Sequence, residues 1–252
     1  MAIQRIKLLG VPVDICRPEN LEGEIMELMA RPGSKQIVFL TIWKLLRARS
    51  KKSTFAQCIR DADLIIPVSK SILMAARFLK CPVPYRYNPF NAVIQILSIL
   101  ERHVRSLYLL GGRKRTVMQT ERNINSTFRA LKVVGRYVGY YPKSVEENIV
   151  QAIYKASPTL VLLSEGVRDR DCWAYTRKNK FSSSIFLYYH DIFGIFSERK
   201  RRVSGESFEK GLEIWSEIFH NPFKIFLVFP YIKFLLILLF HKFFRKNDYI
   251  NF

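Results

Sequence analysis

Hydrophobic positions along the chain fall into short apolar runs, separated by longer stretches in which polar and apolar residues mix. The runs have the composition and length of buried strands, whereas the stretches between them are typical of helices. This alternation favours helical layers around a mostly parallel sheet. We therefore predict an α/β, Rossmann-like fold, a mostly parallel sheet flanked by helices. The predicted strands lie within 35–40, 63–68, 106–112, 159–166 and 183–189.

The stretch after the first strand has a helical pattern. Leu45, Leu46, Phe55 and Ile59 are spaced as on the buried side of a helix, with basic residues between them. We expect this segment to cover the sheet.

A glycine pair, Gly111 and Gly112, ends the third predicted strand. Glycines at such a place can form a tight turn that lets the backbone approach a ligand closely. A plain turn from strand to helix explains the pair equally well, and both interpretations stay open.

The C-terminal part of the chain differs from the rest. Residues 225–240 are nearly all large and apolar, interrupted by Pro230 and Lys233 and followed by basic residues. The run is shorter than the roughly 20 residues of a membrane-spanning helix. Its basic flank and aromatic residues favour a helix lying on an anionic membrane, with contact through 225–246. A buried terminal helix is the alternative.

These features predict two parts, a core at 1–196 and an appendage at 197–252. The appendage begins with a charged loop, in which residues 199–202 read RKRR, before the membrane-associating helical tail. This basic run could hold a phosphate group, or it could be solvated. Residues 211–222 have helical spacing that indicates packing.

The charge balance limits the classes of binding partner that the protein can have. The chain has 41 Lys plus Arg against 21 Asp plus Glu, so its field attracts nucleic acid, anionic lipid or phosphorylated ligands. No RNP, helix-turn-helix or zinc pattern is present, and we do not expect a nucleic-acid partner.

The cysteines and the N-terminus indicate the compartment. Cys16, Cys58, Cys81 and Cys172 lie far apart in the sequence, which favours reduced thiols in the cytoplasm. Their spacing does not indicate a metal site, and we expect no metal and no cofactor. The N-terminal residues lack an apolar run before a small-residue cleavage site, so we expect no signal peptide there.

Several segments resemble, in order and spacing, the WecG/TagA/CpsF family of bacterial glycosyltransferases. They run from LLGVPVDI at 8–15, through SLYLLGGRK at 106–114 and GVRDRDCWAYTRKNK at 166–180, to GLEIWSEIFHNPFK at 211–224. The resemblance implies transfer of an N-acetylhexosamine, often N-acetylmannosamine, from a UDP-sugar to a polyprenyl-diphosphate-linked sugar. It implies a cytoplasmic protein, peripheral on the inner face of the cell membrane, and a homo-oligomer is a further possibility.

The motif that carries catalysis departs from the family pattern. Family members usually have Pro-Asp-Gly after the second core strand, and the Asp is the proposed base; this chain has Pro67, Val68 and Ser69. General base catalysis is worth about 10²- to 10⁴-fold, so its loss matters. The catalytic residue is therefore unknown, with Thr41, Asp191 and His190 as candidates. A purely structural role for His190 is the alternative.

Other motif positions are altered as well. Trp43 stands where the family has Asn, and Asn91 stands where it has Asp. Arg168 and Arg170 are additional charges that either bind a diphosphate or are simply exposed. The residues expected from the resemblance to bind substrate are Thr41, Arg86, Asn91, Gly111, Gly112, Gly166, Arg170, Asp171 and Trp173.

The altered motifs leave a second function open. A catalytically inactive relative could keep the fold and the membrane contact and act as a binding or scaffolding subunit. The loss of the Asp at Val68 and of the Asn at Trp43 motivates this alternative.

Overall fold

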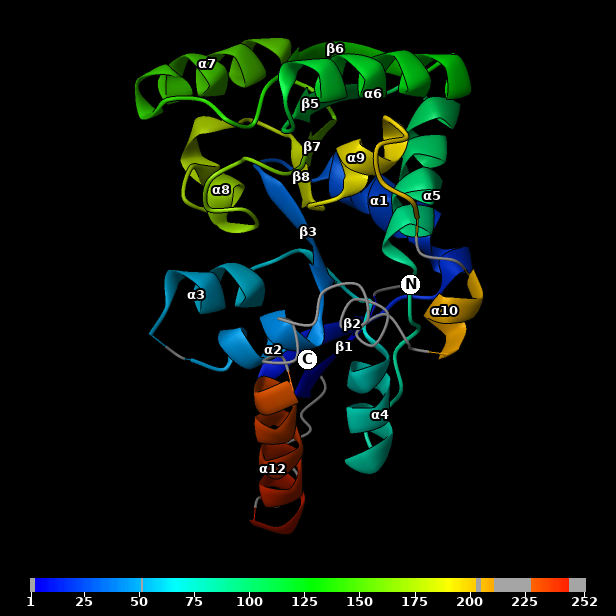
Figure 1. The fold of residues 1–252 in the computed structure, drawn as a ribbon, viewed down its shortest axis with the longest axis vertical. Coiled ribbons are helices and arrows are strands. Elements are labelled where there is room, and N and C mark those ends of the chain that lie inside the picture. The colour runs from blue at the N-terminus through cyan, green and yellow to red at the C-terminus, as the bar shows by residue number, and fades with distance from the viewer. Residues whose placement is uncertain (1–2, 51, 203–204, 211–227, 245–252) are drawn as a thin grey trace.

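The protein is built around one parallel sheet, seen in a computed structural model that describes residues 3–50, 52–202, 205–210 and 228–244 (Figure 1). The spatial order is β4-β3-β8-β7-β5-β6, and all neighbouring strands are parallel. The predicted α/β class with a mostly parallel sheet is confirmed. The strands are β3 (Lys35–Leu40), β4 (Leu64–Pro67), β5 (Ser106–Leu110), β6 (Lys132–Tyr137), β7 (Leu160–Leu163) and β8 (Ile185–Tyr188).

The edge strand β6 is not predicted by the hydrophobic pattern. It is largely exposed, because it has a neighbour on one side only, and its sequence mixes charged and apolar residues. Gly135 lies against the Tyr108 ring, where an added Cβ atom would come within 2.4 Å of the ring. Packing against β5 thus stabilises a strand that the hydrophobic pattern of the sequence does not predict.

Alternate residues of each central strand point to opposite faces of the sheet. In β3, Ile37 and Phe39 belong to one hydrophobic cluster, whereas Val38 and Leu40 belong to another. The first face is covered by α1 (Leu21–Ala30), α5 (Pro89–Arg102), α6 (Lys114–Thr127) and α9 (Ile192–Phe196). The second face is covered by α2 (Ile42–Ala48), α3 (Thr54–Arg60), α4 (Lys70–Phe78), α7 (Glu146–Ala156) and α8 (Cys172–Tyr175).

The segment after β3 forms two helices, so the prediction of one helix is wrong. α2 ends at Ala48, and α3 begins at Thr54. The Ser53 side chain accepts a hydrogen bond from Ala56 N at 3.1 Å, and such a cap starts a new helix. Phe55 and Ile59 are nevertheless buried, because each helix turns its apolar side to the sheet.

A hairpin of β1 (Gln4–Leu8) and β2 (Val11–Ile15) packs beside the sheet. Asp14 in β2 is buried and accepts hydrogen bonds from Arg5 Nε and Ile65 N, both at 2.6 Å. This carboxylate links the hairpin to β4. Short 3₁₀ turns occur at η1 (Pro18–Asn20), η2 (Lys143–Val145) and η3 (Lys178–Lys180).

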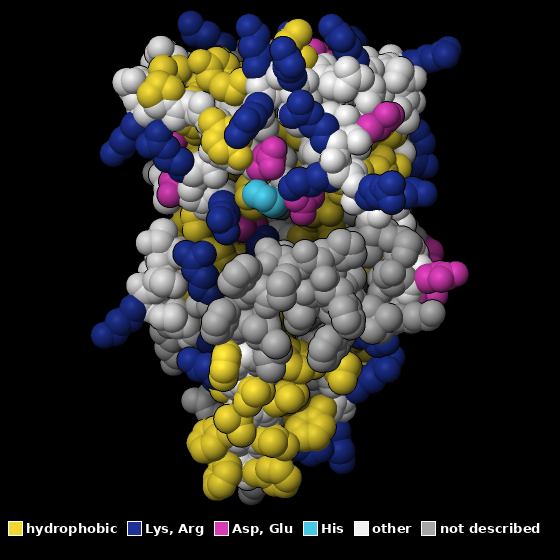
Figure 2. Space-filling model, viewed as in Figure 1, with side chains coloured by type: hydrophobic (Ala, Val, Ile, Leu, Met, Phe, Trp, Pro, Cys, Tyr) yellow, Lys and Arg dark blue, Asp and Glu magenta, His cyan; other side chains and the backbone are white. Residues whose placement is uncertain are grey.

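The C-terminal helix α12 (Val228–Phe244) projects from the lower end of the molecule in Figure 1. Phe234 and Leu238 pack into the cluster of the second face, while Leu236 and Phe243 are 62% and 73% exposed. Hydrophobic side chains consequently cover this projection in Figure 2. No described helix is both long and apolar enough to cross a membrane. The predicted packing helix at 211–222 lies outside the described residues.

The carboxyl ends of the parallel strands lie along one edge of the sheet. At this edge the order of the strands changes direction. β4 lies on one side of β3, and the later strands lie on the other. Ligands of open α/β sheets bind outside the carboxyl ends of the strands at such a switch point. In this fold the switch point lies between the ends of β3 and β8, at Leu40 and Tyr188.

Candidate active site

A cavity of about 520 Å³, which we name the Lys44 pocket, opens at the ends of β3 and β8. Its wall combines cationic, acidic and aromatic side chains with a histidine. Figure 2 shows a histidine side chain among basic and acidic side chains near the middle of the face. Such a mixture suits a ligand with phosphates and a planar ring. The lining residues are Thr41, Trp43, Lys44, Arg47, Phe55, Asp169, Arg170, Asp171, Tyr188 and His190.

Thr41 directly follows β3 and begins α2. Its Oγ1 accepts a hydrogen bond from Lys44 N at 3.2 Å, which makes it the N-cap of the helix. The cap holds the first turn of α2 against the pocket. The Thr41 hydroxyl can still donate its own proton to a ligand.

Lys44 and Asp171 form a nearly buried ion pair. Lys44 Nζ lies 2.6 Å from Asp171 Oδ1, and the two side chains are 21% and 3% exposed. Gln36 Nε2 donates to the Asp171 carbonyl at 2.5 Å, so β3 helps to hold this loop. A buried carboxylate needs such a partner, because isolated charge in the interior is costly.

The loop before Asp171 has an unusual backbone. Asp169 and Arg170 have φ values of 59° and 49°, a region that non-glycine residues rarely adopt. Consecutive residues of this kind are costly and are often found at functional sites. The surrounding contacts therefore hold Arg170 at the pocket, against the intrinsic preference of its backbone.

His190 is exposed and follows β8 at the pocket wall. Its Nδ1 lies 3.2 Å from the Tyr188 hydroxyl, and its Nε2 makes no hydrogen bond within the described part of the chain. Burial raises the pKa of Tyr188 to about 12, which keeps its phenol protonated at neutral pH. If Nδ1 carries the proton and donates it to Tyr188, Nε2 is free to accept one.

Asp191, the other candidate base, faces a different neighbour. Lys200 Nζ lies 2.5 Å from Asp191 Oδ1 and 3.7 Å from Glu165 Oε2. Burial opposes the Lys200 charge, but these carboxylates outweigh it and raise the Lys200 pKa above its usual value. Asp191 does not line the Lys44 pocket.

The glycines expected to bind substrate are engaged by neighbouring loops. Gly111 N donates to the Tyr137 carbonyl at 3.1 Å and Gly112 N to the Glu165 carbonyl at 2.7 Å. A Cβ atom on Gly111 would lie 2.8 Å from Ser164, and one on Gly166 would lie 2.7 Å from the Tyr140 ring. These glycines permit close packing of the loops after β5, β6 and β7, and a ligand role for them stays a prediction.

Trp173 is fully buried in α8. Its Nε1 donates to the Tyr141 hydroxyl at 2.9 Å, and its ring packs near Phe181 and Phe186. This environment gives Trp173 a packing role, and its predicted contact with a substrate stays untested.

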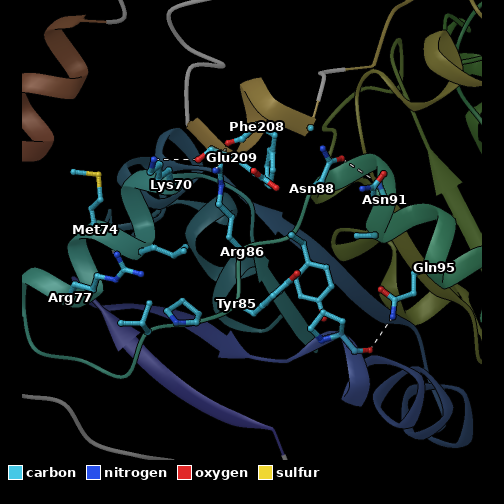
Figure 3. A pocket seen from close by; sticks show the side chains of 17 residues that line it. Lys70, Met74, Arg77, Tyr85, Arg86, Asn88, Asn91, Gln95, Phe208 and Glu209 are labelled. Carbon is cyan, nitrogen blue, oxygen red and sulfur yellow. Dashed lines mark hydrogen bonds between the residues drawn. The ribbon is translucent and has the colours of Figure 1, made fainter.

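A second cavity of about 720 Å³, which we name the Arg86 pocket, lies beyond β4 (Figure 3). Arg86 and Asn91 line it, so the structure separates them from Thr41 and Asp171. Arg86 Nη1 donates to the Phe208 carbonyl at 2.6 Å, and its guanidinium carbon lies 3.7 Å from the centre of the Phe208 ring. Phe208 belongs to the short helix α10 (Gly205–Lys210).

Val68 and Ser69 line neither pocket but contact residues beside both. Arg86 Nε donates to the Val68 carbonyl at 3.0 Å, while Ile42 N donates to Ser69 Oγ at 3.2 Å. The Val68 side chain is 6% exposed. Val68 stands at the position where the WecG/TagA/CpsF family has its acid. This position therefore lies next to Arg86 on one side and to the first residue of α2 on the other.

Sequence reasoning missed several pocket residues. Arg47 and Phe55 were predicted only as parts of a helix, Tyr188 was predicted as part of a strand, and Lys44 was not singled out. The available signal was the position of Lys44 just after a strand end. No signal in the sequence indicates that Lys44 meets Asp171, which is 127 residues away.

The basic run at 199–202 is partly docked on the core. Arg199 Nη1 donates to Thr116 Oγ1 at 3.0 Å, and Lys200 pairs with Asp191. Among the residues that the structure describes, no group of three or more His, Cys, Asp or Glu side chains gathers as metal ligands would.

Comparison with known proteins gives one match. The sequence model of the glycosyl transferase WecG/TagA/CpsF family matches residues 6–248, nearly the whole chain. No curated protein matches the chain. The family match confirms the resemblance inferred from the motifs.

Proposed function

The chain belongs to the WecG/TagA/CpsF family of glycosyl transferases, and on this premise we propose that it transfers an N-acetylhexosamine of the N-acetylmannosamine type. The donor is a UDP-sugar, and the acceptor is a polyprenyl-diphosphate-linked sugar. The reaction contributes to cell-envelope polysaccharide. The observation that carries the proposal is the Lys44 pocket, which combines cations and aromatic rings at the switch point of the sheet.

The chemistry of the Lys44 pocket supports a nucleotide diphosphate. Lys44, Arg47 and Arg170 offer positive charge for phosphate oxygens. Trp43 and Phe55 offer aromatic surface for the base, and the Arg47 guanidinium carbon already lies 4.2 Å from the centre of the Phe55 ring. Trp43 replaces the amide expected there and so changes the pocket from polar to aromatic.

The proposed reaction needs stabilisation of a departing diphosphate. The acceptor hydroxyl oxygen attacks C1 of the donor sugar, and the C1–O bond to the diphosphate breaks with its electron pair remaining on UDP. Lys44 and Arg170 lie where they can stabilise this developing charge. Lys44 can bind a phosphate oxygen while it stays paired with Asp171, because its ammonium group has three donors and its side chain is 21% exposed.

We propose that His190 Nε2 accepts the proton of the acceptor hydroxyl during the transfer. The two carboxylates of the pocket are already paired with cations. Asp171 Oδ1 lies 2.6 Å from Lys44 Nζ, and Asp169 Oδ2 lies 3.6 Å from Arg177 Nη1. His190 is exposed at the pocket, and the buried neutral Tyr188 can hold its other nitrogen. His190 thus replaces the acid lost at Val68.

The proposed location is the inner face of the cell membrane, with a peripheral cytoplasmic protein attached through residues 225–246. The exposed apolar side chains of α12, among them Leu236, Phe240 and Phe243, support it. Lys233 and Lys242 are exposed on the same helix and suit an anionic surface.

The test is a transfer assay with the full chain and a polyprenyl-diphosphate-linked acceptor in detergent micelles. We expect UDP-N-acetylhexosamine to bind and to be turned over, and Lys44→Gln to weaken donor binding about tenfold. Lys180→Gln is a matched control, because its side chain is exposed and pairs with Glu147. Absence of both binding and turnover with every UDP-N-acetylhexosamine would overturn the proposal.

A catalytically inactive scaffold is the second candidate. The hydrocarbon at Val68, buried at 6% exposure, favours it. This candidate predicts donor binding without transfer, so the same assay separates the two functions.

A further inference from the structure

Arg177 lies two residues after α8 and does not line the Lys44 pocket, yet it contacts the loop that does. Its Nη1 lies 3.6 Å from Asp169 Oδ2 and donates to the Trp173 carbonyl at 2.8 Å. Asp169 and Arg170 belong to the pocket wall. We propose that Arg177 is a positioning residue, which fixes Arg170 for the diphosphate of the donor. The inference rests on the proposed donor site and adds to it a residue that does not itself touch the substrate.

Arg177 is anchored at the start of α7. Its Nη2 lies 2.8 Å from Glu146 Oε1, and the two side chains are only 16% and 15% exposed. Glu146 is the first residue of α7, where the helix dipole favours a carboxylate. Its Oε1 also accepts hydrogen bonds from Trp173 Nε1 at 3.1 Å and from the Tyr141 hydroxyl at 3.2 Å. This carboxylate therefore joins α7 to α8, which are neighbours in Figure 1, and holds Arg177 between them.

The Arg177 guanidinium has a defined orientation. Its carbon lies 5.1 Å from the centre of the Trp173 ring, which is fully buried and offers a rigid surface. Nη2 pairs with Glu146, whereas Nη1 faces Asp169. A guanidinium presents its donors in a rigid fork, so the pair on one side sets the direction of the donors on the other. Arg177 thus relates the position of α7 to that of the pocket loop.

The loop needs such a restraint because its backbone is strained. Asp169 and Arg170 have φ values of 59° and 49°, and two consecutive left-handed residues with side chains are costly. The Asp169 carbonyl accepts from Cys172 N at 2.8 Å, and the Arg170 carbonyl accepts from Trp173 N at 3.1 Å. These bonds fix the backbone of the turn to α8, while Arg177 pairs with the Asp169 side chain. Without that pair, the two residues are free to relax towards the more favourable right-handed region and to move Arg170 from the pocket wall.

Two ion pairs hold this loop, one at each end. Asp171 Oδ1 lies 2.6 Å from Lys44 Nζ at the pocket, and Asp169 pairs with Arg177 behind it. Arg170 lies between the two carboxylates in the chain and is exposed at the pocket wall, so it is available to a ligand. A donor diphosphate then meets a cation whose place is set before binding. Preorganisation of this kind strengthens binding, because less freedom is lost when the ligand arrives.

The experiment is a double-mutant cycle on the full chain, with UDP as the probe and binding measured by calorimetry. We expect Arg177→Gln and Arg170→Gln each to weaken UDP binding about tenfold. The double variant should bind about as weakly as Arg170→Gln alone, because Arg177 acts through Arg170. A change that only destabilises the fold would not lose its effect on binding in this way. Arg102→Gln on α5, where an exposed arginine pairs with Glu22, is the matched control and should keep native affinity.

Conservative variants test the same geometry with the fold better preserved. Arg177→Lys keeps a charge for Glu146 but lacks the rigid fork, so it should recover only part of the UDP affinity. Its remaining loss should again vanish in the Arg170→Gln background. Urea unfolding of each variant shows that folded protein is compared. Should Arg177→Gln fail to fold, the cycle with Arg177→Lys decides the question.

Native UDP affinity in the Arg177 variants would overturn the inference and leave the donor site standing. Additive losses in the cycle would overturn it as well, since Arg177 would then act independently of Arg170. If the native protein binds no UDP, the proposed donor site is wrong, and the positioning role is refuted with it. A loss that disappears in the Arg170→Gln background is the result that supports the inference.

Discussion

Lys44 Nζ and Asp171 Oδ1 lie 2.6 Å apart, and this contact joins the first turn after β3 to the loop after β7. The pair lines the Lys44 pocket, so the same contact stabilises the fold and sets the charge of the candidate site. Removing one partner of a buried pair leaves an uncompensated charge.

Asp171→Asn should therefore reduce the free energy of unfolding by on the order of 3 kcal/mol. The double variant Lys44→Gln/Asp171→Asn should recover part of this loss, because the uncompensated charge is gone. Urea unfolding of the four proteins in the cycle measures both effects. Lys180 and Glu147, whose side chains are 48% and 56% exposed, are the control pair and should contribute less than about 1 kcal/mol. Equal losses for the two pairs would contradict this account.

His190→Gln should lower the transfer rate by about 10²- to 10⁴-fold, since a glutamine amide cannot act as a general base. Tyr188→Phe should have a smaller effect, because it removes only the partner that orients Nδ1 at 3.2 Å. Transfer rates of both variants, measured beside the native protein at one pH, test this prediction. A His190→Gln enzyme with the native transfer rate would leave His190 a structural residue.

Stability should fall in alkali because of buried tyrosines. Burial raises the pKa of Tyr188 and of Tyr141 to about 12, above the value of about 10 for an unfolded chain. The folded state therefore holds more protons between these values. The associated stability is fully present below pH 10 and is lost as the pH rises through 12. Thermal unfolding at successive pH values, together with phenolate absorbance, checks this. Tyr188→Phe should flatten the decline, whereas Tyr154→Phe, on an exposed side chain, should not.

Val68→Asp with Ser69→Gly restores the motif of the family. If His190 is a substitute base, the restored acid should change transfer little or should increase it within the range of about 10²- to 10⁴-fold. If the native protein is an inactive scaffold, transfer should appear only in the restored variant. Ser69→Gly alone is the control, because it removes the acceptor of the Ile42 N hydrogen bond at 3.2 Å. Native activity equal to or above that of the restored protein would refute the scaffold.

Membrane attachment should depend on the exposed side of α12. Leu236, Phe240 and Phe243 are 62%, 60% and 73% exposed, so changing all three to Ser should abolish sedimentation with anionic vesicles and leave the fold intact. Tyr154→Ser, a change of an exposed aromatic residue on α7, is the control. Undiminished sedimentation of the triple variant would exclude α12 as the attachment.

Local patterns were sufficient to predict most of the sheet. Buried strands such as β3 and β7 have apolar residues on both faces, so each appears in the sequence as a continuous apolar run. β6 was not predicted, because an exposed edge strand lacks that pattern. The break between α2 and α3 was also missed, since the Ser53 cap competes with a spacing that suits one long helix.

The sequence by itself determined the α/β class, the apolar C-terminal helix, the family resemblance and the loss of the acid at Val68, because each depends on residues close together in the chain. Only the tertiary structure decided which distant residues share a pocket. Parallel strands bring their carboxyl ends to one edge, so Lys44 meets Asp171 there, whereas Arg86 lies in another cavity and Trp173 in the core. Strand order, which local patterns do not encode, sets these distances.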